Sequence, residues 1–142
     1  MSEKSLRHAV RDALKPGFVL QVENAMQSGT PDTYVGLIEW RGWLELKYAR
    51  EIPARATTGV FTSLNRGLEV AQEATLFKMW QHSPGSAWVY VRIEKDCYLV
   101  PGEQSFAFNT MTLSDFQKFS CALNFLRGRL VDYSFFSGTS IV

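Results

Sequence analysis

The apolar residues at the start of the chain recur at helical spacing. Between residues 3 and 14 they fall at steps of three and four positions, which places them on one face of a helix. Ser2 can cap the start of that helix, and Pro16-Gly17 ends it. Residues 18–22 are rich in β-branched and aromatic side chains, so a strand is expected to follow the helix.

The middle of the chain has the pattern of an antiparallel hairpin. Residues 24–31 contain Ser, Gly, Thr and Pro, which are typical of a loop. Residues 33–40 then predict a second strand, Arg41-Gly42 a tight turn, and residues 43–48 a third strand.

After the hairpin the chain becomes polar before it returns to helical periodicity. Residues 49–65 predict a loop beside the hairpin, and Asn65 is placed to cap a helix over residues 66–82. The apolar positions of that helix predict a buried stripe of Val70, Ala74, Phe77 and Trp80.

The last part of the chain adds strands and a helix. Ser83-Pro84-Gly85 ends the preceding helix, residues 87–93 predict a fourth strand, and a turn leads to a short strand at 97–100. A final helix is expected over residues 113–126, capped by Thr112 or Ser114. Its apolar face consists of Phe116, Phe119, Leu123 and Leu126.

These elements follow one another in the order α-β-β-β-α-β-(β)-α, with no internal repeat and no linker. The order predicts one mixed α/β domain over residues 1–142. At 142 residues, with 46% apolar and 20% charged side chains, the chain can bury its own core.

Composition also indicates the cellular compartment in which the protein is expected. The chain has 2 cysteines, which form no CxxC pair, and it shows no secretory signal, so we expect a reduced, cytoplasmic protein. Its longest apolar runs are far too short to span a bilayer, which argues against a membrane partner.

The net charge of +1 gives no general affinity for nucleic acid, so DNA binding must come from local basic groups. Arginines flank the hairpin on both sides, and scattered solvated charge is the alternative interpretation of each. The expected DNA contacts are Arg7, Arg11, Arg50 and Arg55, while Lys15 and Arg41 extend the same basic set.

The hairpin carries the candidate chemistry. Strand alternation places Glu45 and Lys47 on one face, and Asp32 lies at the mouth of the partner strand, where pairing can bring it towards Glu45. Two carboxylates near a lysine favour a divalent cation such as Mg2+ or Mn2+, with Lys47 stabilising developing negative charge. An exposed strand face with a loose Glu45–Lys47 ion pair is the alternative.

The sequence Gly29-Thr30-Pro31-Asp32, followed by Gly36 and then by Trp43-Leu44-Glu45-Leu46-Lys47, resembles the core of the PD-(D/E)xK nuclease superfamily. It looks most like the VRR-NUC and archaeal Holliday-junction-resolvase branches, where "G-x-PD" and "E-x-K" stand on a hairpin. The resemblance covers about residues 2–93 and leaves 94–142 as a C-terminal extension. It implies a restriction-endonuclease-like fold, with an α-β-β-β-α-β core, a mixed central sheet flanked by helices, and a C-terminal helix.

The resemblance also implies roles for individual residues. Asp32 and Glu45 would be metal ligands together with the main-chain carbonyl of Leu46, and Lys47 would be the catalytic lysine. Related enzymes carry a glutamate on the first helix, where Glu3 stands here.

Further acids, amides and imidazoles of the chain have alternative interpretations. Glu23 is a rival to Glu3 for the additional acid, and Gln72 stands where such families often have a glutamine on the helix after the third strand. A favourable acid in a helix first turn and a surface glutamine are the ordinary alternatives for Glu3 and Gln72. His8 and His82 are expected to be structural or solvent-facing.

The function expected from these features is a Mg2+- or Mn2+-dependent endonuclease that hydrolyses DNA phosphodiester bonds, selects branched or junction structures, and acts as a homodimer. A phage or mobile element is the expected source. The alternative is a non-catalytic nucleic-acid-binding module that keeps the nuclease fold. A third possibility is an interaction protein whose aromatic tail, Tyr133, Phe135 and Phe136, contributes a partner surface.

Overall fold

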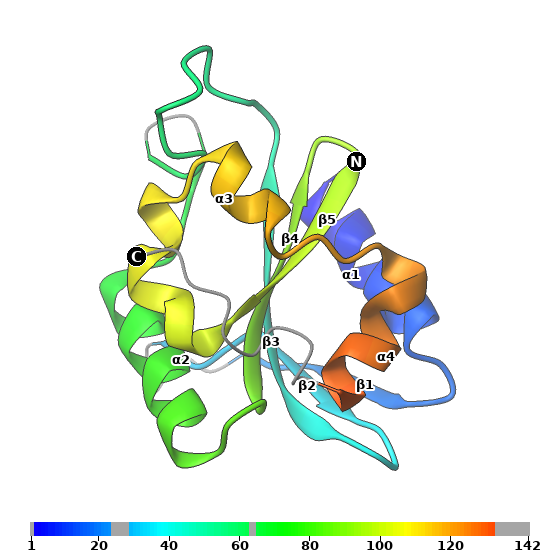
Figure 1. Cartoon of the computed structure of the whole chain (residues 1–142). Coiled ribbons are helices and arrows are strands. Elements are labelled where there is room, and N and C mark those ends of the chain that lie inside the picture. The colour runs from blue at the N-terminus through cyan, green and yellow to red at the C-terminus, as the bar shows by residue number, and fades with distance from the viewer. Residues whose placement is uncertain (1, 24–28, 63–64, 133–142) are drawn as a thin grey trace.

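The protein is described by a computed structural model over residues 2–23, 29–62 and 65–132. A five-stranded sheet in the order β1-β2-β3-β4-β5 forms its centre, with helices on both faces (Figure 1). Along the chain the elements are α1 (Glu3–Ala13), β1 (Phe18–Gln21), β2 (Thr33–Gly36), β3 (Arg41–Ala49), α2 (Val70–His82), β4 (Ala87–Ile93), β5 (Asp96–Pro101), the 3-10 helix η1 (Gly102–Thr110), α3 (Leu113–Gln117), the 3-10 helix η2 (Leu123–Phe125) and α4 (Leu126–Val131).

The sheet is mixed because of one crossover. Strands β1, β2 and β3 form an antiparallel meander, and α2 then returns the chain so that β4 lies parallel to β3. Strand β5 completes the sheet by antiparallel pairing with β4. The crossover buries the two central strands, and in β4 only Arg92 is not classed as buried.

Helices cover both faces of the sheet, and the core lies between the layers. In Figure 1, α1 and α4 lie on one side, and α2 with η1 lies on the other. The side chain of Ser2 accepts a hydrogen bond from the Ser5 N–H, which confirms the expected cap of α1. The expected restriction-endonuclease-like α/β fold with a mixed sheet flanked by helices is confirmed.

The hairpin turn differs from the sequence prediction. Strand β2 ends at Gly36, and the turn spans residues 37–40, closed by a hydrogen bond from the Leu37 N–H to the Trp40 carbonyl. Gly36 pairs with Arg41, so Arg41-Gly42 belongs to β3 and the predicted turn there is wrong. The Trp40 indole donates to the Gly85 carbonyl at 2.7 Å, and this anchor fixes the turn earlier than local composition indicated.

Helix α2 also begins later than predicted. Its N-cap is Glu69, not Asn65, because the preceding segment is held against η1. The Asn109 amide accepts from the Leu68 N–H and donates to the Leu68 carbonyl, both at 2.8 Å. The predicted buried stripe is wrong at Val70, which is 79% exposed, and at Ala74, which is also exposed. Phe77 and Trp80 are partly buried, and the buried residue of α2 is Leu76.

The predicted C-terminal helix is broken into pieces. Tyr98 and Ser120 form an isolated antiparallel bridge, and the Leu99 N–H donates to the Phe119 carbonyl. Pairing with β5 therefore ends α3 at Gln117, and helical structure resumes only at residue 123. The expected cap at Thr112 is present, and the apolar positions of this region pack as expected, with Phe116, Phe119 and Leu126 buried and Leu123 partly buried.

Several expectations fall outside the described residues, including most of the predicted 24–31 loop and the aromatic tail of Tyr133, Phe135 and Phe136. Within the described ranges, Cys97 and Cys121 are free, buried thiols. None of the helices in this part of the chain has the length and apolar character needed to cross a membrane.

Candidate active site

The register of the hairpin brings Asp32 and Glu45 together. Thr33, the first residue of β2, pairs with Leu44, so Asp32 lies level with the centre of β3. The Asp32 N–H donates to Glu45 Oε1 at 3.2 Å. Asp32 Oδ1 in turn accepts from the Thr33 hydroxyl at 2.9 Å and from the Leu46 N–H at 3.3 Å. Each carboxylate is therefore oriented by hydrogen bonds to the other strand.

Lys47 completes a buried charged cluster with these acids. Its Nζ lies 3.7 Å from Glu45 Oε2, as expected for two residues on one face of a strand. Glu45 is 4% exposed and Lys47 is 7% exposed. The alternative of a loose ion pair on an exposed strand face is therefore contradicted.

Gln72 reaches the same cluster from α2. Its Nε2 donates to Glu45 Oε2 at 3.3 Å, while its Oε1 accepts from the Glu69 N–H at 2.9 Å. The capping box at the start of α2 therefore fixes the orientation of the amide. Because the oxygen is occupied by the helix cap, Gln72 presents its donor side to the acid.

Burial raises the pKa of both acids, and the charge of Asp32 adds to the rise at Glu45. Desolvation is the largest cause for Glu45, followed by the charge of Asp32, and together they raise its pKa to about 8 despite the nearby Lys47. Desolvation likewise raises the pKa of Asp32, against the lowering effect of its hydrogen bonds from Thr33 and Leu46. The two carboxylates share one environment, which favours a bound cation over two bare negative charges.

The structure distinguishes between Glu3 and Glu23, the two candidates for the additional acid. The negative charge of Glu3 contributes to the raised pKa of both Asp32 and Glu45, so the start of α1 lies beside the cluster. Glu23 is exposed and is not among the main groups that perturb either acid. The geometry therefore groups Glu3, and not Glu23, with the hairpin acids.

The main-chain carbonyl of Leu46 points towards the edge of β3 that lies beside Asp32. In antiparallel pairing the N–H and C=O of one residue lie on the same strand edge. The Leu46 N–H meets Asp32, so its carbonyl faces the β2 edge too. Continuing the register from Thr33 and Leu44 places Pro31 opposite, and proline has no N–H to donate to that carbonyl.

Asp32, Glu45 and the Leu46 carbonyl thus offer an oxygen-only donor set to a cation. Among the described residues, no group of three or more His, Cys, Asp and Glu side chains could hold a metal ion. Mg2+ is commonly bound by one or two carboxylates and keeps several waters, so this sparse set fits it, and Mn2+ accepts the same oxygen donors.

The predicted basic contacts are distributed unevenly around the cluster. Arg50 lines a cavity of about 250 Å3 together with Glu3 and Lys47. Arg7 lies one turn along α1 from Glu3 and is half-buried, and its Nε has no hydrogen-bond partner within the described residues, whereas Arg11 is exposed.

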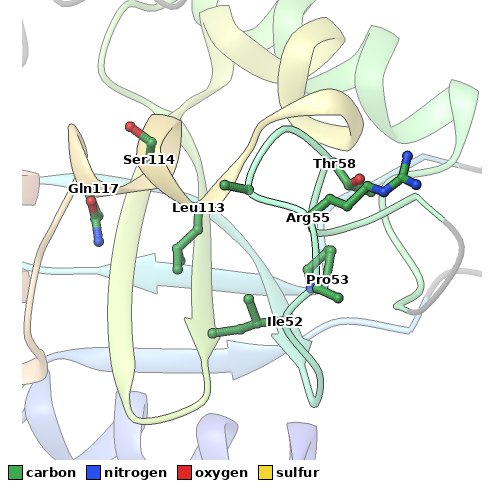
Figure 2. Close-up of a pocket in the computed structure, with 9 residues that line it drawn as sticks. Ile52, Pro53, Arg55, Thr58, Leu113, Ser114 and Gln117 are labelled. Carbon is green, nitrogen blue, oxygen red and sulfur yellow. The ribbon is translucent and has the colours of Figure 1, made fainter.

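Arg55 belongs to a different cavity of about 320 Å3 between the loop after β3 and α3. Figure 2 shows its guanidinium extending away from Leu113 and Gln117. The lining of this cavity contains no Asp, Glu, His or Cys, so it lacks the acid and base groups that hydrolysis requires. The two histidines, His8 and His82, are both exposed.

Sequence reasoning missed three residues of this region: Thr33, Asn65 and Arg66. Thr33 is buried and orients Asp32, a role that its position directly after Asp32 could have indicated. Asn65 and Arg66 line the cavity beside Lys47. The sequence pattern predicts Asn65 as a helix cap and Arg66 as the first helical residue, and the contact between Leu68 and Asn109 of η1 delays that helix.

Comparison with known proteins supports the fold. No family model matches the chain, and no curated protein matches it. Among solved structures it is similar to Hjc, a Holliday junction resolvase from the archaeal hyperthermophile Archaeoglobus fulgidus, with a TM-score of 0.60 and 15% identity. The alignment covers 90% of this chain and 97% of the resolvase. At this identity the likeness establishes a shared fold.

Proposed function

We propose that this protein is a Mg2+- or Mn2+-dependent endonuclease that hydrolyses phosphodiester bonds in DNA and prefers branched or junction substrates. The observation that carries the proposal is the contact between the Asp32 N–H and the Glu45 carboxylate at 3.2 Å, with Lys47 Nζ 3.7 Å from the same carboxylate. A structural ion pair would need one acid, whereas this cluster contains a second, half-buried acid, and the pKa of both acids is raised.

Each residue of the cluster has its own role in the proposed hydrolysis. Asp32, Glu45 and the Leu46 carbonyl would hold the cation, which supplies positive charge that polarises the phosphoryl oxygens and eases attack by water. Lys47 donates hydrogen bonds to a phosphoryl oxygen or to the attacking water, and thereby stabilises negative charge in the transition state. Gln72 positions Glu45 by donating to its Oε2. Glu3 is proposed as an additional acid at the edge of the site.

The preference for branched DNA rests on the shared fold with a protein named as a Holliday junction resolvase. A domain of this size has few surfaces with which to read base sequence, and a homodimer would present two such centres to a symmetric substrate. A cytoplasmic location and a role in DNA recombination or repair belong to the same proposal.

The test is a cleavage assay on plasmid, linear and four-way-junction DNA with Mg2+, Mn2+ or EDTA. We expect cutting that requires metal, is lost in Lys47→Ala, and persists in Lys78→Ala, a matched change at an exposed lysine of α2. Failure of the wild type to cut any DNA form with either metal would contradict the proposal. DNA retention unchanged by Asp32→Asn would then identify a non-catalytic binding module.

A further inference from the structure

A cavity of about 250 Å3 opens directly beside the candidate reaction centre. It shares Glu3 and Lys47 with that centre, and its remaining wall consists of Tyr48, Arg50, Asn65 and Arg66. Three of the six lining side chains are cationic and one is anionic, which gives this cavity a positive balance in a protein of net charge +1. A positive concavity adjoining a hydrolytic centre favours a polyanionic ligand.

We propose that this cavity is a subsite for the phosphate of the nucleotide adjacent to the one cleaved, and that Asn65 is the residue that positions it. The inference rests on the proposed nuclease function and specifies how the DNA strand enters the site. Arg50 and Arg66 supply the charge, and Lys47 forms the boundary between the subsite and the reaction centre.

Arg50 is suited to this role because no carboxylate of the described residues forms an ion pair with it. It is exposed, directly follows β3, and forms no ion pair within the described residues. Lys47, three residues earlier, is already paired with Glu45. The strand therefore delivers one buried lysine to the reaction centre and one free arginine to the cavity beside it.

The amide of Asn65 fixes the chain around Arg50. Its Oδ1 accepts from the Arg50 N–H at 3.0 Å and from the Glu51 N–H at 3.4 Å. Its Nδ2 donates to the carbonyls of Glu51 and Val60, both at 2.8 Å. Both donors and both acceptor positions of the amide are thus used on the main chain. Asn65 holds together the two ends of the loop that leaves β3, and so sets the path of residue 50.

Arg66 can exchange its present partner for a phosphate at low cost. It pairs with Glu69 at 2.9 Å, but the two side chains are 84% and 58% exposed. Such solvent-exposed ion pairs contribute little free energy. A phosphate in the cavity offers the guanidinium another charge-assisted partner, with which it can form two parallel hydrogen bonds.

The first test measures binding to four-way-junction DNA in EDTA, so that it is independent of cleavage. Arg50→Ala should weaken binding roughly tenfold and reduce the slope of log affinity against log salt by about one. Lys95→Ala is the control, because Lys95 is an exposed cation in the turn between β4 and β5 and does not line this cavity. Equal losses in both variants would overturn the subsite.

The second test replaces one DNA phosphate at a time with an uncharged methylphosphonate. The wild type and Lys95→Ala should lose about tenfold in affinity at one position adjacent to the cleaved bond, while Arg50→Ala should lose nothing more there. If Arg50→Ala loses as much as the wild type at every position, the subsite is wrong even where cleavage is intact. Absence of cleavage with intact binding would instead overturn the proposed function.

The positioning role of Asn65 has its own readout. Asn65→Ala should reproduce the loss and the reduced salt slope of Arg50→Ala, and the double variant should bind no more weakly than Asn65→Ala alone. In cleavage assays Asn65→Ala should raise KM with little change in kcat. Additive losses in the double variant would show that Asn65 does not act through Arg50.

Discussion

The main-chain N–H of Asp32 donates to the side chain of Glu45 across 13 positions of sequence, at 3.2 Å. This contact makes the two acids one unit, since each is oriented by the strand that carries the other. It also sets their electrostatics, because the charge of Asp32 is the second-largest cause of the raised pKa of Glu45.

The first prediction concerns stability against pH in the absence of metal. The pKa of Glu45 rises from 4.5 to about 8 on folding, so between these values the folded state keeps a proton that the unfolded state has released. The free energy of unfolding should therefore fall as pH rises through this window, at most by about 1.4 kcal/mol per pH unit. Glu45→Gln should lose this slope. Denaturant titrations from pH 4.5 to 8 measure it, and equal slopes for both proteins would contradict the assignment.

The second prediction concerns metal binding by the folded protein. Mg2+ or Mn2+ should raise the Tm of the wild type at pH 8, because a ligand that binds only the folded state stabilises it by mass action. Asp32→Asn removes one ligand charge and should lose most of this rise. Asp115→Asn is a control, since Asp115 lies in the capping box of α3. A metal-induced rise that survives Asp32→Asn would exclude Asp32 as a ligand.

The candidate site was predictable to the extent that it depends on strand alternation. Glu45 and Lys47 share a face because side chains of a strand alternate, and Asp32 stands near them because β2 and β3 pair in a hairpin. These relationships are local, so the sequence pattern contains them.

The wrongly predicted helix boundaries have a common physical origin in contacts between segments that are distant in the sequence. Asn65 looks like a helix cap, yet Asn109 holds Leu68 from 41 positions away and delays α2. Residues 113–126 have helical periodicity, yet the bridge between Tyr98 and Ser120 interrupts the helix. In both places tertiary hydrogen bonds outweigh the local helix propensity, which differs between residue types by a few tenths of a kcal/mol and by about 1 kcal/mol for glycine.

The third prediction concerns Gln72, whose amide joins the cap of α2 to Glu45. Gln72→Ala should lower cleavage by 10- to 100-fold, the usual range for residues that orient a metal ligand. A shift of the pH profile of kcat should accompany the loss, because Glu45 loses a hydrogen-bond donor. Gln117→Ala, on the far side of the loop cavity, is the matched control. A loss of activity with an unchanged pH profile would indicate a role in helix stability alone.

The fourth prediction concerns the two thiols, which have no role in the proposed hydrolysis. Cys97 and Cys121 are buried, and burial raises the pKa of both thiols, that of Cys121 to about 12. The thiolate is the reactive form, so both cysteines should react slowly with a disulfide reagent such as Ellman's reagent while the protein is folded. In denaturant both thiols should react within the mixing time. In the folded protein the rate of labelling should follow the rate at which the structure opens around the thiols rather than the pH of the solution. Rapid labelling of either thiol in the folded protein would contradict the packing of β5 against residues 119–121.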